Sequence, residues 1–447
     1  MSTDNTNKEL HAKKRRQLID RNRRKEEQRT WHLWYIRIFT YLFAAFLAVS
    51  ILLIPIRPKE SVSEKRELAE FPKISISALF TGSWFSGTDS WFSDTFPFRD
   101  RLRSFHSGLE KLYGLKSEEL YGATGQGDEI PETAEPAPVL PPEEALENAD
   151  DEAAGTVYIA DHRGYEVYYF HNDSSVSYAS ALNTVHEILG DSITIYDLLA
   201  PTAFSVCLNE QTQKSLGGSS ARDAFNYIYS LLDPAIVKVP VIDTLTEHNA
   251  EYIYFNTDHS WTQLGAYYAY LAFCQAKGFT PNDLSSYTEG QYPGFLGSFY
   301  SDSNQSGALH SNPDTLITFT PIGTNECIIS DGQGYDYTHP VIDNASKSAS
   351  GDKYSAFIGG DNALTTINNP SITDGSSCVV IKESYGNAFV PFLTDHYQTV
   401  YVVDYRYYSM NNLTTFIQQN SVSDLIFLNH ADAIRQSNAA DMLHLFK

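Results

Sequence analysis

The chain has 447 residues and a mass of 50.1 kDa, which is more than a single hydrophobic core usually supports. Its composition is 42% hydrophobic and 13% aromatic, which excludes a wholly disordered chain. A mean hydropathy of -0.31 excludes a protein with many membrane spans, and a formal net charge of -23 argues against nucleic acid as a partner of the main body. The sequence therefore describes an acidic globular protein.

The first part of the chain has a different character from the rest. Residues 1–37 form an arm rich in Lys and Arg, and residues 38–56 contain no charged side chain. Nineteen residues at about 1.5 Å each give a helix of roughly 28 Å, close to the thickness of the hydrocarbon core of a bilayer. Residues 56–58 read Ile-Arg-Pro, unlike the small-residue cleavage site of a signal peptide. This pattern predicts a single-pass anchor of the plasma membrane, with the basic arm cytoplasmic and residues 57–447 extracellular.

Two further segments are expected between this anchor and the main domain. Residues 57–121 are predicted to form a juxtamembrane helical module, because apolar residues between 98 and 112 recur at steps of four and three. Residues 122–155 contain many acidic residues and prolines and no aromatic residue, a composition typical of a disordered insert. A hairpin over 157–170 then opens the domain of residues 156–447.

That domain alternates short apolar runs with longer helical patterns, which is typical of an α/β fold with a mostly parallel sheet. We expect strands at 193–199, 239–245, 252–255, 379–382, 399–403 and 425–428. Helices are expected at 179–189, 221–232, 261–276 and 387–394. Ligands of such sheets bind at the carboxyl ends of the strands, so the loops after residues 255 and 382 are the candidate site.

The four cysteines lie outside the membrane in this topology and are widely spaced. Two disulfides with three alternative connectivities are allowed, although buried free thiols are the favoured interpretation. Their spacing matches no zinc motif, and no metal or other cofactor is predicted.

The candidate site combines residue types that serine hydrolases need. Ser384 stands between a strand and a helix, where the free N–H groups of the helix start can stabilise an oxyanion. Asp258 and His259 follow the strand expected at 252–255 and offer an acid and a base. A serine at a strand end is more often a helix cap, so spacing alone leaves catalysis and capping both open.

Four motifs in this order resemble the DHHW family of bacterial surface proteins: FPFRDR (96–101), TDHSWT (257–262), KESYGNAF (382–389) and VVDYRYY (402–408). That family is similar to the permuted SGNH-hydrolase-like domains of the alginate O-acetylation machinery. The resemblance implies a flavodoxin-like, three-layer α/β domain with Ser384 as nucleophile, Asp258 as orienting acid and Trp261 as the loop tryptophan. It also implies O-acetyl transfer to, or removal from, a cell-envelope polysaccharide, with a multi-span membrane acyltransferase as partner.

The base does not follow the pattern of the family. The wider group carries its catalytic histidine two residues after the aspartate, and Ser260 occupies that position here. Ser260 also fits a capping box with Gln263. His259 remains as the base if it turns inward, and His310, His396 and His430 are further histidines whose positions the sequence does not fix.

Weaker candidates for substrate or oxyanion contacts are Asn362, Asn387 and Arg406. Asn362 lies in a Gly-Gly-Asp-Asn turn, and Arg406 has an ion pair with Asp404 as its simpler interpretation. The alternative function is a catalytically inactive carbohydrate-binding or scaffold protein of the envelope that has kept the fold and lost the base.

Overall fold

The computed structural model describes residues 118–122, 125–132, 135–141, 155–332 and 334–447, together with scattered positions between 34 and 95. The chain divides into two units, Met1–Leu102 and Arg103–Lys447. In the described part of the first unit, β1 (Glu60–Ser61) pairs with β2 (Arg66–Glu67) in antiparallel orientation. The rings of Phe71 and Trp91 meet edge to face with centroids 4.8 Å apart.

Most of the predicted anchor at 38–56, and the helix expected at 98–112, lie outside the described residues. Among the residues that are described, no helix combines the length and the apolar character needed to cross a bilayer. The anchor therefore stays a prediction from the sequence.

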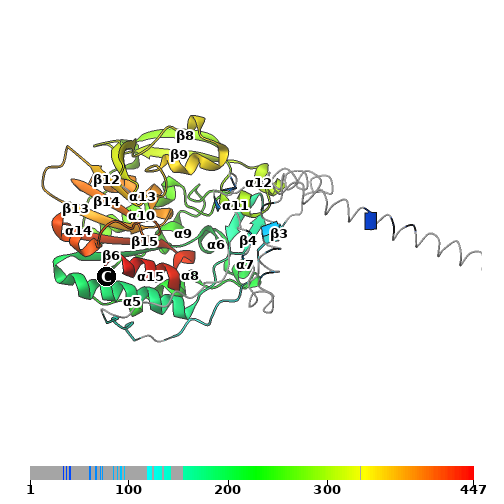
Figure 1. The fold of residues 1–447 in the computed structure, drawn as a ribbon, viewed down its shortest axis with the longest axis horizontal. Helices are drawn as coiled ribbons and strands as arrows, with labels where there is room; N and C mark the ends of the chain where they lie inside the picture. Colours follow the sequence, from blue (N-terminus) through cyan, green and yellow to red (C-terminus); the bar gives the residue numbers. More distant parts are fainter. Residues whose placement is uncertain are drawn as a thin grey trace, which may run out of the picture. The chain divides into compact units, whose positions relative to one another are not determined.

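The second unit is built on an eight-stranded mixed sheet (Figure 1). In spatial order its strands are β11 (Asp336–Pro340), β10 (Glu326–Ser330), β12 (Leu364–Asn368), β14 (Thr399–Asp404), β13 (Ser377–Lys382), β15 (Asp424–His430), β6 (Thr194–Ala200) and β7 (Val237–Lys238). The strands from β14 to β7 run parallel, whereas β12, β10 and β11 extend the sheet with antiparallel pairs.

The parallel strands are buried on both faces, because helices cover them on either side. Every residue of β13 is buried, and in β6 and β15 only one terminal residue is not; continuous burial is typical of central parallel strands. Figure 1 shows α5 (Asn172–Leu189), α8 (Ala221–Leu231) and α15 (Gln436–His444) gathered beside β6. A second group consists of α9 (Ile242–Glu247), α10 (Gln263–Lys277) and α13 (Tyr385–Leu393). The predicted α/β class is confirmed.

Smaller elements complete the unit. Strands β3 (Glu118–Tyr121), β4 (Val157–Ala160) and β5 (Arg163–Glu166) form an antiparallel sheet, which confirms the hairpin expected at 157–170. Strands β8 (Thr288–Phe295) and β9 (Asp314–Thr320) form a separate pair. The remaining helices are α6 (Ala203–Cys207), α7 (Glu210–Ser215), α11 (Ser298–Asp302), α12 (Gly307–His310) and α14 (Leu413–Gln419).

Two predicted strands are wrong. The segment 239–245 contains part of helix α9, since Ile242 and Leu245 are buried at helical spacing. The segment 252–255 forms a single bridge, Tyr254 with Trp261. Directly after this segment, the carboxylate of Asp314 accepts hydrogen bonds from the backbone N–H groups of Asn256 (2.8 Å) and Thr257 (2.7 Å).

Part of the insert that was predicted to be disordered packs along the domain. Residues 125–132 and 135–141 lie along the domain without regular structure. Asp128 N–H donates to the oxygen of Phe170 (2.7 Å), and Ala137 N–H donates to that of Leu231 (2.9 Å). In a disordered, solvated segment, these backbone groups would form their hydrogen bonds with water instead. All four cysteines are free, as the favoured interpretation expected.

Candidate functional site

The two predicted loops converge at the carboxyl end of β13. Trp261 is fully buried, and its Nε1 donates to the backbone oxygen of Tyr385 (2.9 Å). In return the Tyr385 hydroxyl donates to the backbone oxygen of His259 (2.6 Å). The Tyr354 hydroxyl donates to the backbone oxygen of Ser384 (3.0 Å). Trp261 is therefore a link between the two loops, with its only polar atom committed to the backbone.

Ser384 stands at the junction of β13 and α13, and its hydroxyl does not cap the helix. Gly386 lets the helix approach the strand, because a Cβ there would lie 2.6 Å from Cβ of Lys382. The Ser384 hydroxyl donates to Asp361 Oδ2 (2.7 Å) and accepts from a terminal guanidinium nitrogen of Arg406 (3.3 Å). Within the described chain no histidine is among its hydrogen-bond partners.

Asp361 is the centre of a charge network around this serine. Its Oδ1 accepts from Lys382 Nζ (3.0 Å) and Asn387 Nδ2 (2.8 Å), and its Oδ2 also pairs with Arg406 (3.0 Å). Asp404 is fully buried and pairs with Lys382 (2.8 Å) and with Arg406 in two-pronged geometry (2.8 and 2.7 Å). We call these residues the Ser384 network: Asp361, Lys382, Ser384, Asn387, Asp404 and Arg406.

A strained turn places Asp361 in this network. The three residues before it, Ile358, Gly359 and Gly360, all have positive φ (49°, 74° and 84°). A β-branched residue in this region is unusual and costs on the order of 1–3 kcal/mol, a strain that is typically stored at functional sites. The side-chain donor of Asn362 is used within this turn, since Asn362 Nδ2 donates to the backbone oxygens of Ile358 and Gly360 (both 3.2 Å).

The electrostatics of the network oppose activation of the serine. Burial favours the neutral acid, but Lys382, Arg406 and the donors Ser384 and Asn387 outweigh it and hold the pKa of Asp361 well below its usual range. A carboxylate with so low a pKa is a poor acceptor for the proton of a serine hydroxyl. In the described part of the chain, the Ser384 hydroxyl is thus held by a carboxylate and a guanidinium.

The depressed pKa of Asp361 predicts a pH dependence of folding stability. A carboxylate with a lower pKa in the folded chain stabilises it above the unfolded pKa, and this contribution is lost as the pH falls. We expect the free energy of unfolding, measured by urea titration, to decline below about pH 5, and to decline less steeply in Asp361→Asn. The exposed Asp243→Asn is the control and should keep the wild-type slope; equal slopes in all three proteins would contradict the assignment.

Asp258 and His259 lie beside this network with other partners. Asp258 accepts from the backbone N–H groups of Ser260 (2.9 Å) and Ser298 (2.8 Å), while His259 Nδ1 lies 2.8 Å from Ser298 Oγ and 3.7 Å from Asp258 Oδ1. The acid therefore holds the loop rather than the imidazole. Ser260 does not cap α10, because the cap is Thr262, whose hydroxyl accepts from Gly265 N–H (3.3 Å); the predicted capping box is wrong.

Sequence reasoning missed a group of residues around His430. Its ring stacks on that of Tyr385 with centroids 4.6 Å apart, and its Nδ1 lies 3.1 Å from Glu383 Oε1. Burial opposes ionisation of Glu383, but His430 above all lowers its pKa to about 2. The sequence named His430 only as one of several spare histidines, and its position after a predicted buried strand was the one available signal. His396 instead contacts the Tyr270 hydroxyl (2.5 Å), and His310 contacts the ring of Tyr300.

With this geometry described, comparison with known proteins identifies the family. The family model described as "DHHW protein" matches residues 64–136 and 143–403, which is more than half of the chain. The chain belongs to the DHHW family. A solved DHHW family protein from Eubacterium siraeum is similar to this chain at 28% identity and a TM-score of 0.58, over 66% of this chain and 97% of that one.

Two further solved structures are similar to this chain at lower identity. Bacillus cereus PatB1, solved with a sulfonyl adduct, is 18% identical with a TM-score of 0.53, over 65% of this chain and all of that chain. The O-acetyltransferase domain of Pseudomonas putida AlgJ is 12% identical with a TM-score of 0.33, over 59% and 84% of the two chains. No match was found among curated proteins. This chain departs from the Asp-His-His-Trp pattern of the family name at Ser260.

Proposed function

We propose that this DHHW protein is a membrane-anchored envelope protein that binds cell-envelope polysaccharide at the carboxyl edge of its sheet and does not use Ser384 as a nucleophile. The proposal that Ser384 is not a nucleophile rests on one observation. The Ser384 hydroxyl donates to Asp361, a carboxylate with a depressed pKa, and no histidine replaces it as a partner in the described residues. Loss of a general base lowers a rate by about 10²–10⁴-fold.

Exposed tyrosines at this end of the sheet support the binding half, one beside Arg406 and two at β11, which three strands separate from β13. Tyr407 is 54% exposed, and Arg406 lies over its ring at 5.4 Å. Tyr335 and Tyr337 are exposed on β11 and the turn before it, with ring centroids 6.0 Å apart. This turn lies against the loop after β14, since a Cβ at Gly332 would be 3.6 Å from Met410 Cγ. Flat rings with polar edges, beside a guanidinium, suit the apolar faces and hydroxyls of sugars.

The topology expected from the sequence supports a ligand of the cell envelope. Residues 38–56 are long enough to anchor the chain, and the basic arm before them directs the domain outward. An acidic exterior disfavours adhesion to anionic polymers, so we expect neutral or cationic polysaccharide rather than a highly anionic one.

Binding to isolated envelope polysaccharide tests the proposal. We expect the full-length chain in mild detergent to co-sediment with cell-wall polysaccharide from its own host, and Tyr407→Ala to bind at least about fivefold more weakly, as expected for loss of roughly 1 kcal/mol of ring contact. Ile188→Ala removes an exposed apolar side chain from α5 and is the matched control. Equal binding by both variants, or no binding by the wild type, would overturn the binding proposal.

O-acetyl transfer or removal is the second candidate, and it is favoured by the convergence of the Ser384 and His259 loops. In that case Ser384 attacks an acyl carbon, His259 takes its proton, and a multi-span membrane acyltransferase supplies the acyl group. Hydrolysis of a chromogenic acetyl ester distinguishes the candidates. The binding proposal predicts equal background rates for wild type and Ser384→Ala, whereas a rate lost only in the variant supports acyl chemistry.

A further inference from the structure

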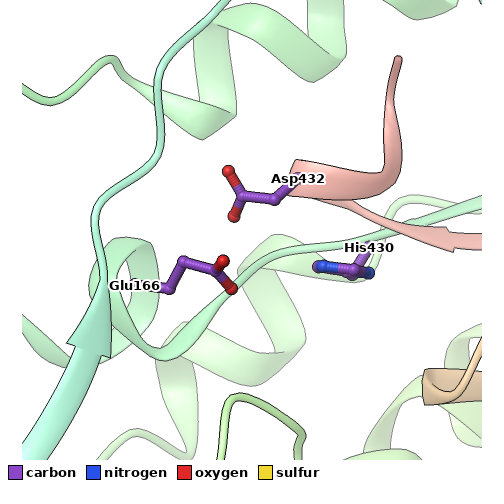
Figure 2. Close-up of side chains that lie close together, drawn as sticks. All are labelled: Glu166, His430 and Asp432. Atoms are coloured by element: carbon purple, nitrogen blue, oxygen red, sulfur yellow. The ribbon is translucent and has the colours of Figure 1, made fainter. Parts of the chain in front are cut away.

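A second polar cluster lies beside Tyr385 and takes no part in the function proposed above. Glu166 is the last residue of β5, His430 is the last residue of β15, and Asp432 lies in the short helix η7 (Ala431–Ala433). One ligand atom from each lies within 4.8 Å of the other two. Figure 2 shows the two carboxylates and the edge of the imidazole facing the same space, although Glu166 comes from a segment far in the sequence from the other two.

The carboxylates of this cluster are incompletely satisfied. Glu166 Oε2 and Asp432 Oδ2 are buried, and neither has a hydrogen-bond partner. The neighbouring Arg435 donates its Nε to the backbone oxygen of Asp432 (2.9 Å). Buried carboxylate oxygens without donors are costly, and two of them side by side repel each other. A cation bound between them would relieve this repulsion, as a shared proton would.

A carboxylate lies close to the ring of the histidine in this cluster. His430 Nδ1 lies 3.1 Å from Glu383 Oε1, and that carboxylate is fixed by the backbone N–H groups of His430 (3.1 Å) and Tyr385 (3.0 Å). Nδ1 makes no hydrogen bond in this arrangement, but a carboxylate close to one ring nitrogen is the kind of neighbour that most metal-binding histidines have. The stacked ring of Tyr385 fixes the plane of the imidazole.

We propose that Glu166, His430 and Asp432 bind one divalent cation of the zinc class. Two carboxylates neutralise its charge, and a neutral imidazole with carboxylate oxygens is a donor set that Zn²⁺ accepts. Calcium and magnesium favour six or more oxygen ligands and bind a ring nitrogen only weakly. Three protein ligands leave a fourth position for water.

The three ligand atoms lie slightly farther apart than they would around a bound zinc ion. Ligand atoms about 2.1 Å from a tetrahedral metal lie roughly 3.4 Å from one another, so binding draws the side chains inward from their separation of up to 4.8 Å. Closure would also tie the end of β5 to the segment after β15. The cation is therefore expected to raise thermal stability as well as to bind.

Metal content of the full-length protein tests this site independently of any polysaccharide or esterase assay. Tag-free, chelator-treated protein in detergent is incubated with Zn²⁺ and desalted, and zinc is measured by mass spectrometry. We expect one zinc per chain in the wild type and at least a tenfold weaker affinity by calorimetry in Glu166→Gln, Asp432→Asn and the double variant. His248→Gln is the control, because His248 and Glu251 form a similar but exposed pair (2.7 Å) outside the cluster.

Melting temperatures separate a metal site from a pair of carboxylates that share a proton. Zn²⁺ should raise the melting temperature of the wild type and the control by several degrees and leave that of the double variant unchanged. Without metal the double variant should be at least as stable as the wild type, because it relieves the repulsion. A wild type that takes up no zinc, or variants that bind it as well as the wild type, would overturn the proposal.

Discussion

Ser260→His is expected to give this protein an esterase activity that depends on Ser384. Ser260 occupies the position where the wider group carries its catalytic histidine, and Asp258 already holds its backbone N–H (2.9 Å). Ser260 is buried and lies next to Tyr354, whose hydroxyl binds the backbone of Ser384 (3.0 Å). A restored base should raise the rate on a chromogenic acetyl ester by about 10²-fold or more.

Two matched variants make this result interpretable. Ser260→Asn changes the size of the side chain without adding a base and should stay at the background rate. Ser260→His combined with Ser384→Ala should lose the gained activity, because the nucleophile is absent. Adding Tyr354→Phe to Ser260→His removes the hydroxyl that competes for the space and should keep or increase the rate. Activity of Ser260→His that survives in the Ser384→Ala background would contradict this interpretation of the site.

Asp404→Asn is expected to destabilise the fold by about 3–5 kcal/mol, the usual cost of removing one partner of a buried ion pair. Lys382 and Arg406 both bind the fully buried Asp404, and its loss leaves two cations to one remaining acid, Asp361. Urea unfolding should show a lower midpoint with an unchanged slope, since the surface exposed on unfolding stays the same.

An exposed ion pair supplies the control for this prediction. Asp243 pairs with Arg222 at the surface, and Asp243→Asn should change the free energy of unfolding by about 1 kcal/mol or less. Replacing the buried pair as a whole, with Lys382→Met and Asp404→Leu together, should cost less than the sum of the two single changes, because neither charge is left alone. Additive effects would show that Lys382 and Asp404 do not stabilise each other.

The parallel half of the fold was predictable from local sequence. The runs that became β6, β13, β14 and β15 are continuous and apolar, because strands buried on both faces need no polar alternation. The segment 252–255 looked the same but forms only one bridge, and the carboxylate of Asp314, nearly 60 residues later, binds the backbone N–H groups that directly follow it. Such a long-range side-chain contact leaves no periodic signal in the segment itself.

The candidate site was predictable in position but not in chemistry. The sequence placed Ser384 and Asp258 at strand ends, and the structure brings their loops together through Trp261 and Tyr385. It did not reveal that the serine hydroxyl would donate to Asp361, because that contact depends on a turn with three consecutive positive φ angles. Glu166 and Asp432 were missed altogether, since they follow strands of two different sheets that only the tertiary fold brings together.

Covalent labelling of Ser384 tests the central claim most directly. A sulfonyl fluoride forms an adduct only with a serine whose hydroxyl a neighbouring base has activated, and peptide mass spectrometry locates the adduct. We expect the wild-type protein to remain unlabelled at Ser384 at neutral pH, while Ser260→His, treated in parallel, acquires one sulfonyl group there. A stoichiometric adduct on Ser384 of the wild type would show that this serine has a working base and would contradict the account.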